Sequence, residues 1–109
     1  MISNKRVLFS KDLQKTAALF NALSHPARLA ILQYLAETKT CITGDIAEEL
    51  PLSRTTVNQH LKELRDSGLI KGTVEGVKTN YCLNVKGIEL LQREANDFFD
   101  KIDLNDSVC

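Results

Sequence analysis

The 109-residue sequence predicts a mainly helical α+β fold, with five helices and a two-stranded hairpin in one domain. Three observations support this class. Apolar residues recur at helical spacing in five segments, a stretch rich in β-branched residues separates the fourth segment from the fifth, and no linker, repeat or low-complexity tract divides the chain. We therefore expect one core and one functional site over residues 1–109.

The first two helices are predicted over residues 11–23 and 26–36, where apolar residues recur every three or four positions. Ser24 can cap the second helix. Pro26 suits its first turn, because the missing N–H of proline would have no partner there in any case. Residues 37–40 are polar and are expected to form a loop.

The third and fourth helices are predicted to lie close together in the chain. The third begins at Thr43, whose hydroxyl can accept an N–H of the first turn, and Pro51 ends it. Ser53 caps the fourth helix, and Gly68 closes it in a left-handed conformation. Only residues 51–53 separate the two helices, and this short connection is typical of a helix-turn-helix.

A hairpin and a last helix complete the fold. Residues 69–74 and 77–83 are rich in Ile, Val, Thr and Tyr, which predicts two strands, and Glu75-Gly76 indicates a tight turn between them. A hairpin directly after a helix-turn-helix forms the wing of a winged helix-turn-helix. Apolar spacing then predicts a fifth helix over residues 85–103.

Charge and composition restrict the partners of this molecule. Fourteen basic residues balance fourteen acidic ones, so no overall field attracts it to nucleic acid or membrane, but residues 54–86 carry six basic and three acidic side chains. With four Phe, two Tyr and no Trp, stacking on single strands is disfavoured, and duplex DNA is the better partner. Neither a membrane span nor a secretory signal is found, which favours a cytoplasmic protein.

The fourth helix has the chemistry of a helix that enters the major groove, which is about 12 Å wide. Arg54 can donate twice to guanine, and the amides of Asn58 and Gln59 can pair with adenine. Lysines and arginines further along the helix and on the wing can contact phosphates. The predicted DNA-binding residues are Ser53, Arg54, Thr55, Thr56, Asn58, Gln59, His60, Lys62, Arg65, Lys71 and Lys78.

These residues also allow other interpretations. A polar helix face can simply be solvated, and His60, near the helix-turn-helix junction, can pack there instead of contacting a phosphate. A winged helix can also serve as a protein-interaction module with little sequence-specific DNA binding, which the zero net charge favours. The sequence contains no catalytic cluster, Gly-rich phosphate loop or metal-ligand spacing, so neither an enzyme nor a cofactor is expected.

Two stretches resemble the ArsR/SmtB family of winged-helix metal and redox sensors. Residues 19–35, LFNALSHPARLAILQYL, are similar to its opening pattern, and residues 52–70, LSRTTVNQHLKELRDSGLI, to its recognition-helix signature. Gly76 and Tyr81 match the G-x-x-x-x-Y of its wing, and the resemblance covers roughly residues 18–83. The residues that fall on the family's base-facing positions are Arg54, Thr55, Asn58 and Gln59.

The resemblance implies a homodimer in which the first and last helices, residues 11–23 and 85–103, pack together. The interface residues that it assigns are Leu13, Phe20, Leu91, Phe98 and Phe99. A two-fold dimer places its recognition helices about 34 Å apart and requires an inverted-repeat operator in double-stranded DNA. The expected function is a dimeric repressor that an effector, which the sequence does not identify, releases from DNA.

Two regions depart from the family pattern. Its metal sensors carry a C-x-C at the positions of Ile42 and Gly44, and the last helix contains no His for the family's other zinc site, so no metal site is expected. In the wing, positions where relatives often carry Arg hold Thr73, Val74 and Val77. We therefore expect weaker anchoring of DNA by the wing.

The three cysteines are odd in number and widely spaced, without a CxxC, so reduced thiols are expected rather than a disulfide framework. Some relatives sense oxidants through a cysteine pair that the dimer brings together. By that resemblance Cys41 and Cys109 are the candidate redox pair, whereas Cys82 lies on the wing. Inert thiols are the alternative, because no neighbouring run of Lys or His favours a thiolate.

Overall fold

The computed structural model describes residues 8–38, 41–43, 50–75 and 78–102. These residues contain four α-helices and a three-stranded antiparallel sheet, in place of the five helices and two strands predicted. Most of the predicted third helix falls on residues 44–49, outside the described part. In chain order the elements are α2 (Lys11–Ala22), α3 (Pro26–Thr38), β1 (Ile42–Thr43), α4 (Arg54–Asp66), β2 (Ile70–Glu75), β3 (Lys78–Leu83) and α5 (Val85–Asp100).

Helices α2 and α3 begin where local signals place them. Ser10 caps α2, because its Oγ accepts the N–H of Leu13 at 3.2 Å. Helix α3 begins at Pro26, and Nδ1 of the preceding His25 accepts a first-turn N–H at 3.0 Å. The helix continues to Thr38, two residues beyond its predicted end, so the loop predicted after it is shorter.

Both predicted ends of α4 are confirmed. The Oγ of Ser53 accepts the N–H of Thr56 at 3.2 Å at the start of the helix. At the other end Gly68 has φ +82°, and the N–H of Leu69 donates to the carbonyl of Leu64 at 3.0 Å. This is the Schellman arrangement, which requires a left-handed residue and therefore favours glycine.

The sheet contains the predicted hairpin and one strand that was not predicted. Glu75, predicted to lie in the turn, is instead the last residue of β2 and pairs with Lys78, while residues 76–77 lie outside the described part. Strand β1 pairs with β3, with Ile42 opposite Tyr81. Thr43, predicted as a helix cap, is therefore the second residue of a strand. A strand of two residues is too short to carry an alternating pattern.

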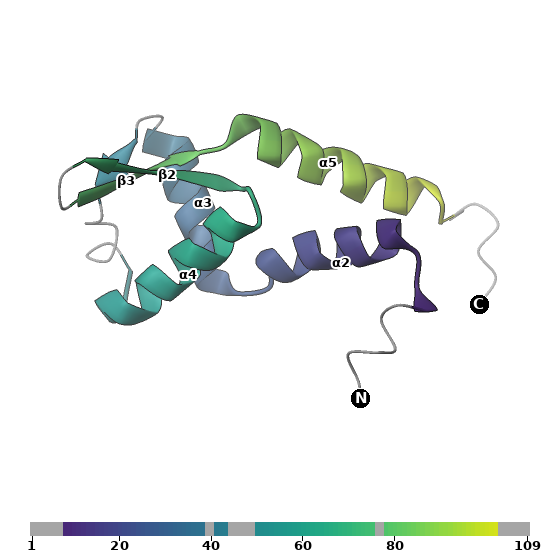
Figure 1. The fold of residues 1–109 in the computed structure, drawn as a ribbon, viewed down its shortest axis with the longest axis horizontal. Coiled ribbons are helices and arrows are strands. Elements are labelled where there is room, and N and C mark those ends of the chain that lie inside the picture. Colours follow the sequence, from purple (N-terminus) through teal and green to yellow (C-terminus); the bar gives the residue numbers. More distant parts are fainter. Residues whose placement is uncertain (1–7, 39–40, 44–49, 76–77, 103–109) are drawn as a thin grey trace.

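The core lies where α3, α4 and the sheet meet. Ile31, Leu61, Leu64 and Leu69 are completely buried there. Helices α2 and α5 run side by side away from this core, as Figure 1 shows, and Leu91 joins α5 to it. No helix in the described ranges is long and apolar enough to cross a membrane.

Candidate nucleic-acid interface

The candidate interface is the outer face of α4. Val57, Leu61 and Leu64 are completely buried, and this burial turns the opposite face of the helix outward. The exposed residues of α4 that the sequence predicts as DNA contacts are Arg54, Thr55, Thr56, Asn58, Gln59, Lys62 and Arg65. Their outward position agrees with the prediction, and their role in binding DNA stays a prediction.

The first two turns of α4 present unengaged polar groups. The side chains of Arg54, Thr55 and Asn58 make no hydrogen bond or ion pair with any other described residue. A guanidinium, a hydroxyl and an amide thus lie within five residues on one exposed surface. These are the groups that donate to guanine, contact phosphates and pair with adenine.

From its second turn onward, α4 carries weak contacts within the helix. Nε2 of Gln59 donates to Oε1 of Glu63 at 3.4 Å, and Nζ of Lys62 lies 3.0 Å from Oδ2 of Asp66. Exposed pairs of this kind contribute only about 0.3 to 0.5 kcal/mol. Gln59 and Lys62 can therefore exchange these partners for a base or a phosphate at little cost.

Ser53 and Thr56 stabilise the first turn of α4. Besides accepting the N–H of Thr56, the Oγ of Ser53 donates to Oγ1 of Thr56 at 2.9 Å. Both residues are exposed, so a phosphate can approach the remaining free N–H groups of the first turn. Their hydroxyls hold the helix end in place as well as offering contacts of their own.

His60 was predicted to contact DNA, and the structure corrects this assignment. Its side chain is 7% exposed, Nδ1 accepts from Nε of Arg28 at 3.3 Å, and its ring lies 4.3 Å from that of His25. Burial, followed by the nearby His25 and Arg28, lowers the pKa of His60 below its ordinary value, and Glu63 opposes this shift. A neutral, buried imidazole of this kind packs inside the subunit.

The wing offers little positive charge. Lys71 on β2 is exposed and is the only cation among the described side chains of the wing. Val74 is 72% exposed and Thr73 is also exposed, at positions where the family often carries arginine. Lys78 begins β3, but its side chain lies outside the described part, as does Val77.

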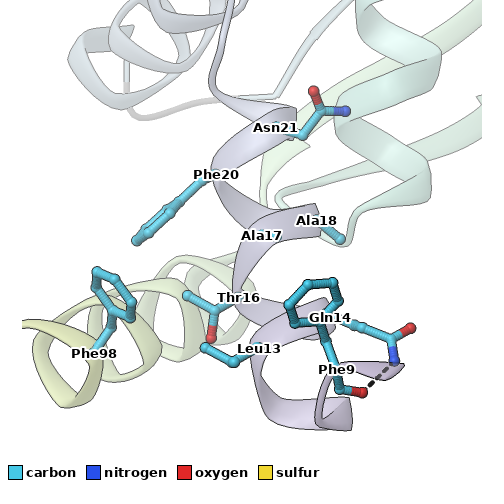
Figure 2. Close-up of a pocket in the computed structure, with 9 residues that line it drawn as sticks. All are labelled: Phe9, Leu13, Gln14, Thr16, Ala17, Ala18, Phe20, Asn21 and Phe98. Atoms are coloured by element: carbon cyan, nitrogen blue, oxygen red, sulfur yellow. Dashed lines mark hydrogen bonds between the residues drawn. The ribbon is translucent and has the colours of Figure 1, made fainter. Parts of the chain in front are cut away.

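An aromatic cluster joins the last turn of α2 to the C-terminal end of α5. Phe20 and Phe98 meet edge to face with ring centroids 6.0 Å apart, and Phe98 lies 5.3 Å from Phe99. Figure 2 shows Phe20 and Phe98 directed toward one another beside a cavity of about 620 Å³, which Phe9 and Leu13 also line. Phe99 is 59% exposed and Leu13 is 48% exposed.

One of the five predicted interface residues is corrected. Leu91 is 9% exposed and belongs to the core cluster, so it stabilises the subunit instead of facing a partner. Leu13 and Phe99 are exposed, and Phe20 and Phe98 are half-buried. These four side chains are available to a partner.

The cysteines differ from both predictions made for them. Cys41 forms a disulfide with Cys82, and their Cα atoms are 4.4 Å apart. The expectation of reduced thiols and the pairing of Cys41 with Cys109 are therefore wrong, and Cys109 itself lies outside the described residues. Strand β1 is the reason, because it brings next to β3 a segment that is 41 residues away in the chain.

Metal binding was not expected from the sequence. Within the described ranges, no group of three or more His, Cys, Asp or Glu side chains could hold a metal ion. Of the two positions that carry the family's C-x-C, Gly44 lies outside the described part, and the side chain of Ile42 is likewise not described.

Comparisons with known proteins agree with this arrangement. Residues 23–73 match a helix-turn-helix domain family. The transcriptional repressor SmtB homolog of Synechocystis sp. is 31% identical over 97 residues, which cover 89% of this chain and 73% of that protein. An ArsR-like transcriptional regulator from Rhodococcus sp. RHA1 superposes with a TM-score of 0.69 at 24% identity, covering 84% of this chain and 85% of that one.

A second solved structure is the homodimeric winged helix-turn-helix DNA-binding domain Mb0332 from Mycobacterium bovis. It superposes with a TM-score of 0.63 at 23% identity and covers 89% of each chain. At this identity the likeness concerns the fold.

A capped, outward-facing polar helix followed at once by a hairpin defines a winged-helix DNA-binding protein. The chain belongs to the ArsR/SmtB family of winged-helix regulators. It is a DNA-binding transcriptional regulator and not an enzyme. The resemblance predicted from residues 19–35 and 52–70 is confirmed.

Proposed function

We propose that this protein is a sequence-specific repressor that binds double-stranded DNA as a homodimer. The observation that carries the proposal is the outer face of α4, where Arg54, Thr55 and Asn58 have no side-chain partner among the described residues. The buried face of the same helix holds it firmly on the core. Such a helix can enter the major groove and cover a promoter until an effector releases it.

Dimerisation is proposed to occur over α2 and α5. Phe99 and Leu13 leave apolar surface exposed beside the aromatic cluster and its cavity, and exposed apolar patches of this kind are typical of protein interfaces. The homodimeric Mb0332 domain, which has the same fold, supports this proposal. A two-fold dimer presents two identical copies of α4, so the expected operator is an inverted repeat.

Arg54→Ala is expected to weaken operator binding by about 1 to 3 kcal/mol and to relax the preference at one base pair, because a bidentate contact to guanine is lost. Gln59→Ala should act in the same way at another base pair. The matched control is Lys71→Ala, which removes a wing charge and should weaken operator and random duplex alike.

Fluorescence anisotropy measures these effects on an operator selected from random duplexes, on its single-base variants and on unselected DNA. If Arg54→Ala lost the same affinity for operator and unselected DNA, Arg54 would contact only the backbone.

A second candidate function is a winged-helix module that contacts another protein. The zero net charge and the single described cation of the wing, Lys71, favour it. A salt titration separates the two functions, because the logarithm of DNA affinity falls by about 0.9 per neutralised phosphate for each unit in log salt. A slope near zero would favour the protein-interaction module.

Phe99→Asp is expected to weaken the dimer by about 3 kcal/mol or more, because association would bury an unpaired carboxylate. Phe99 is chosen because it is 59% exposed, whereas Phe98 is half-buried; both rings contact Phe20, so circular dichroism checks that the variant is folded. Sedimentation velocity measures the change, with Gln92→Asp as a control that adds the same charge at an exposed polar position of α5. An unchanged dimer would remove Phe99 from the interface.

A further inference from the structure

One side chain, Arg28 of α3, connects α2 with α4. Its Nη1 donates to the carbonyl of Asn21 at 3.0 Å and to that of Ala22, the last residue of α2, at 3.4 Å. Its Nε donates to Nδ1 of His60 at 3.3 Å. Among the described residues, no other hydrogen bond joins a side chain of α4 to either helix.

The hydrogen bonding of His60 is unusual for a residue that only fills space. Because Nδ1 accepts from Arg28, the proton of the neutral ring resides on Nε2. That Nε2 is buried and has no hydrogen-bond partner among the described residues. An unsatisfied buried donor costs about 1 to 3 kcal/mol, and at the other ring nitrogen the hydrogen bond from Arg28 offsets this cost. The described contact that favours histidine over an apolar residue at this position is therefore its acceptor toward Arg28.

His25 completes the cluster from the loop between α2 and α3. Its Nδ1 accepts the N–H of Ala27 and so belongs to the start of α3, while its ring lies against that of His60. The cluster of His25, Arg28 and His60 therefore joins the end of α2, the start of α3 and the middle of α4.

Helix α2 is in turn joined to α5. Oγ1 of Thr16, a buried residue, donates to Oε2 of Glu94 at 3.5 Å, and Nζ of Lys15 lies 3.6 Å from Oε1 of the same carboxylate. Phe20 packs on Phe98. A continuous set of contacts thus leads from the two helices proposed to form the dimer, through Arg28, to the helix proposed to read DNA.

We propose that Arg28 and His60 are positioning residues that orient α4 relative to α2 and α5, and thereby set the half-site spacing that the dimer accepts. The proposal rests on the proposed function. Each half-site is read by one copy of α4. A small rotation of this helix in each subunit therefore changes the distance between the two half-sites that the dimer can contact. Without Arg28 the apolar face would still hold α4 on the core, but apolar contacts are non-directional and constrain rotation less than a hydrogen bond does.

Two substitutions of His60 form a matched pair. His60→Asn keeps an amide oxygen near the place of Nδ1, where it can accept from Arg28, whereas His60→Gln carries its amide further out and loses that acceptor. Arg28→Gln removes the donor from the other side. Arg28→Lys is a milder variant that keeps the charge but lacks the planar group needed to reach α2 and His60 together.

Binding is measured on the selected operator and on versions with one base pair added to or removed from the spacer. Wild type and His60→Asn are expected to prefer the native spacer by about tenfold, which corresponds to about 1.4 kcal/mol. His60→Gln and both Arg28 variants are expected to lose most of this preference, while their affinity for random duplex is unchanged. Circular dichroism checks that each variant is folded.

The pH dependence of the spacer preference gives a second readout. Acidification protonates Nδ1 and replaces the acceptor that faces Arg28 with a donor, so the preference of wild type should fall as the pH passes below the lowered pKa of His60. In His60→Asn it should not change over the same range. The charged and titratable groups that act on the ring are His25, Arg28 and, from α4 itself, Glu63. NMR of the ring nitrogens should show the Nε2–H form in wild type and a higher pKa for His60 in Arg28→Gln.

The possible failures are distinct. If folded His60→Gln and Arg28→Gln kept the spacer preference of wild type, the positioning proposal would be overturned and the proposed function would stand. If wild type itself bound no duplex DNA with salt-dependent affinity, both the positioning proposal and the proposed function would be contradicted.

Discussion

Reduction of the Cys41–Cys82 disulfide is expected to lower the free energy of unfolding by about 4 kcal/mol. The bond joins residues 41 positions apart, and in the chain-entropy account a closed loop of that length restricts the unfolded chain by about this amount. Strand β1 has only two residues, so little else is expected to hold it against β3. The loss is large beside the 5 to 15 kcal/mol that typically stabilises a domain.

Urea unfolding with and without dithiothreitol, at one protein concentration because of the proposed dimer, measures this loss. The double variant Cys41→Ser, Cys82→Ser should unfold like the reduced protein under both conditions. Cys109→Ser is the matched control and should keep the difference. Thiol titration of the denatured chain should find one thiol before reduction and three after it, since two of the three cysteines are bonded. Three thiols before reduction would contradict the disulfide.

Local chemistry explains which parts of the fold could be predicted. Each of three helix boundaries depends on the chemistry of one residue. Pro26 needs no N–H in the first turn of α3, Ser53 provides the side-chain acceptor that caps α4, and Gly68 adopts the left-handed backbone that ends it. The helix boundaries at these residues accordingly agree with prediction. The outward face of α4 could be predicted for a similar reason, because Val57, Leu61 and Leu64 recur at four and three residues and are all buried.

The missed features all depend on contacts between distant segments. His60 lies on the same helical stripe as Val57, Leu61 and Leu64, but its partners Arg28 and His25 are more than thirty positions before it in the chain, so the spacing within α4 does not identify them. The Cys41–Cys82 bond follows from the pairing of β1 with β3. Leu91 lies on the apolar stripe of α5 together with Phe98, and periodicity alone does not tell which part of that stripe faces the core.

The start of α5 is packed so closely on the end of α4 that it allows no side chain at Gly87. Nδ2 of Asn84 donates to the carbonyl of Gly68 at 2.9 Å, and the N–H of Asn84 donates to the carbonyl of Leu69 at 3.0 Å. A Cβ on Gly87 would overlap the carbonyl oxygen of Gly68. That carbonyl cannot move freely, because its residue closes α4 in the left-handed conformation and Leu69 is completely buried.

Gly87→Ala is therefore expected to lower the free energy of unfolding by about 3 kcal/mol, the upper part of the usual range for overpacking. Gly72→Ala is the matched control, because its Cβ would meet only side-chain atoms at 3.4 to 3.5 Å and the residue lies in a strand, where alanine is preferred by about 0.5 to 1 kcal/mol. Urea unfolding measures the free energy of unfolding of both variants. Equal midpoints would mean that α5 can shift away from α4. This shift would also move Phe98 and Phe99. Sedimentation of Gly87→Ala then measures how far the proposed dimer depends on the position of α5.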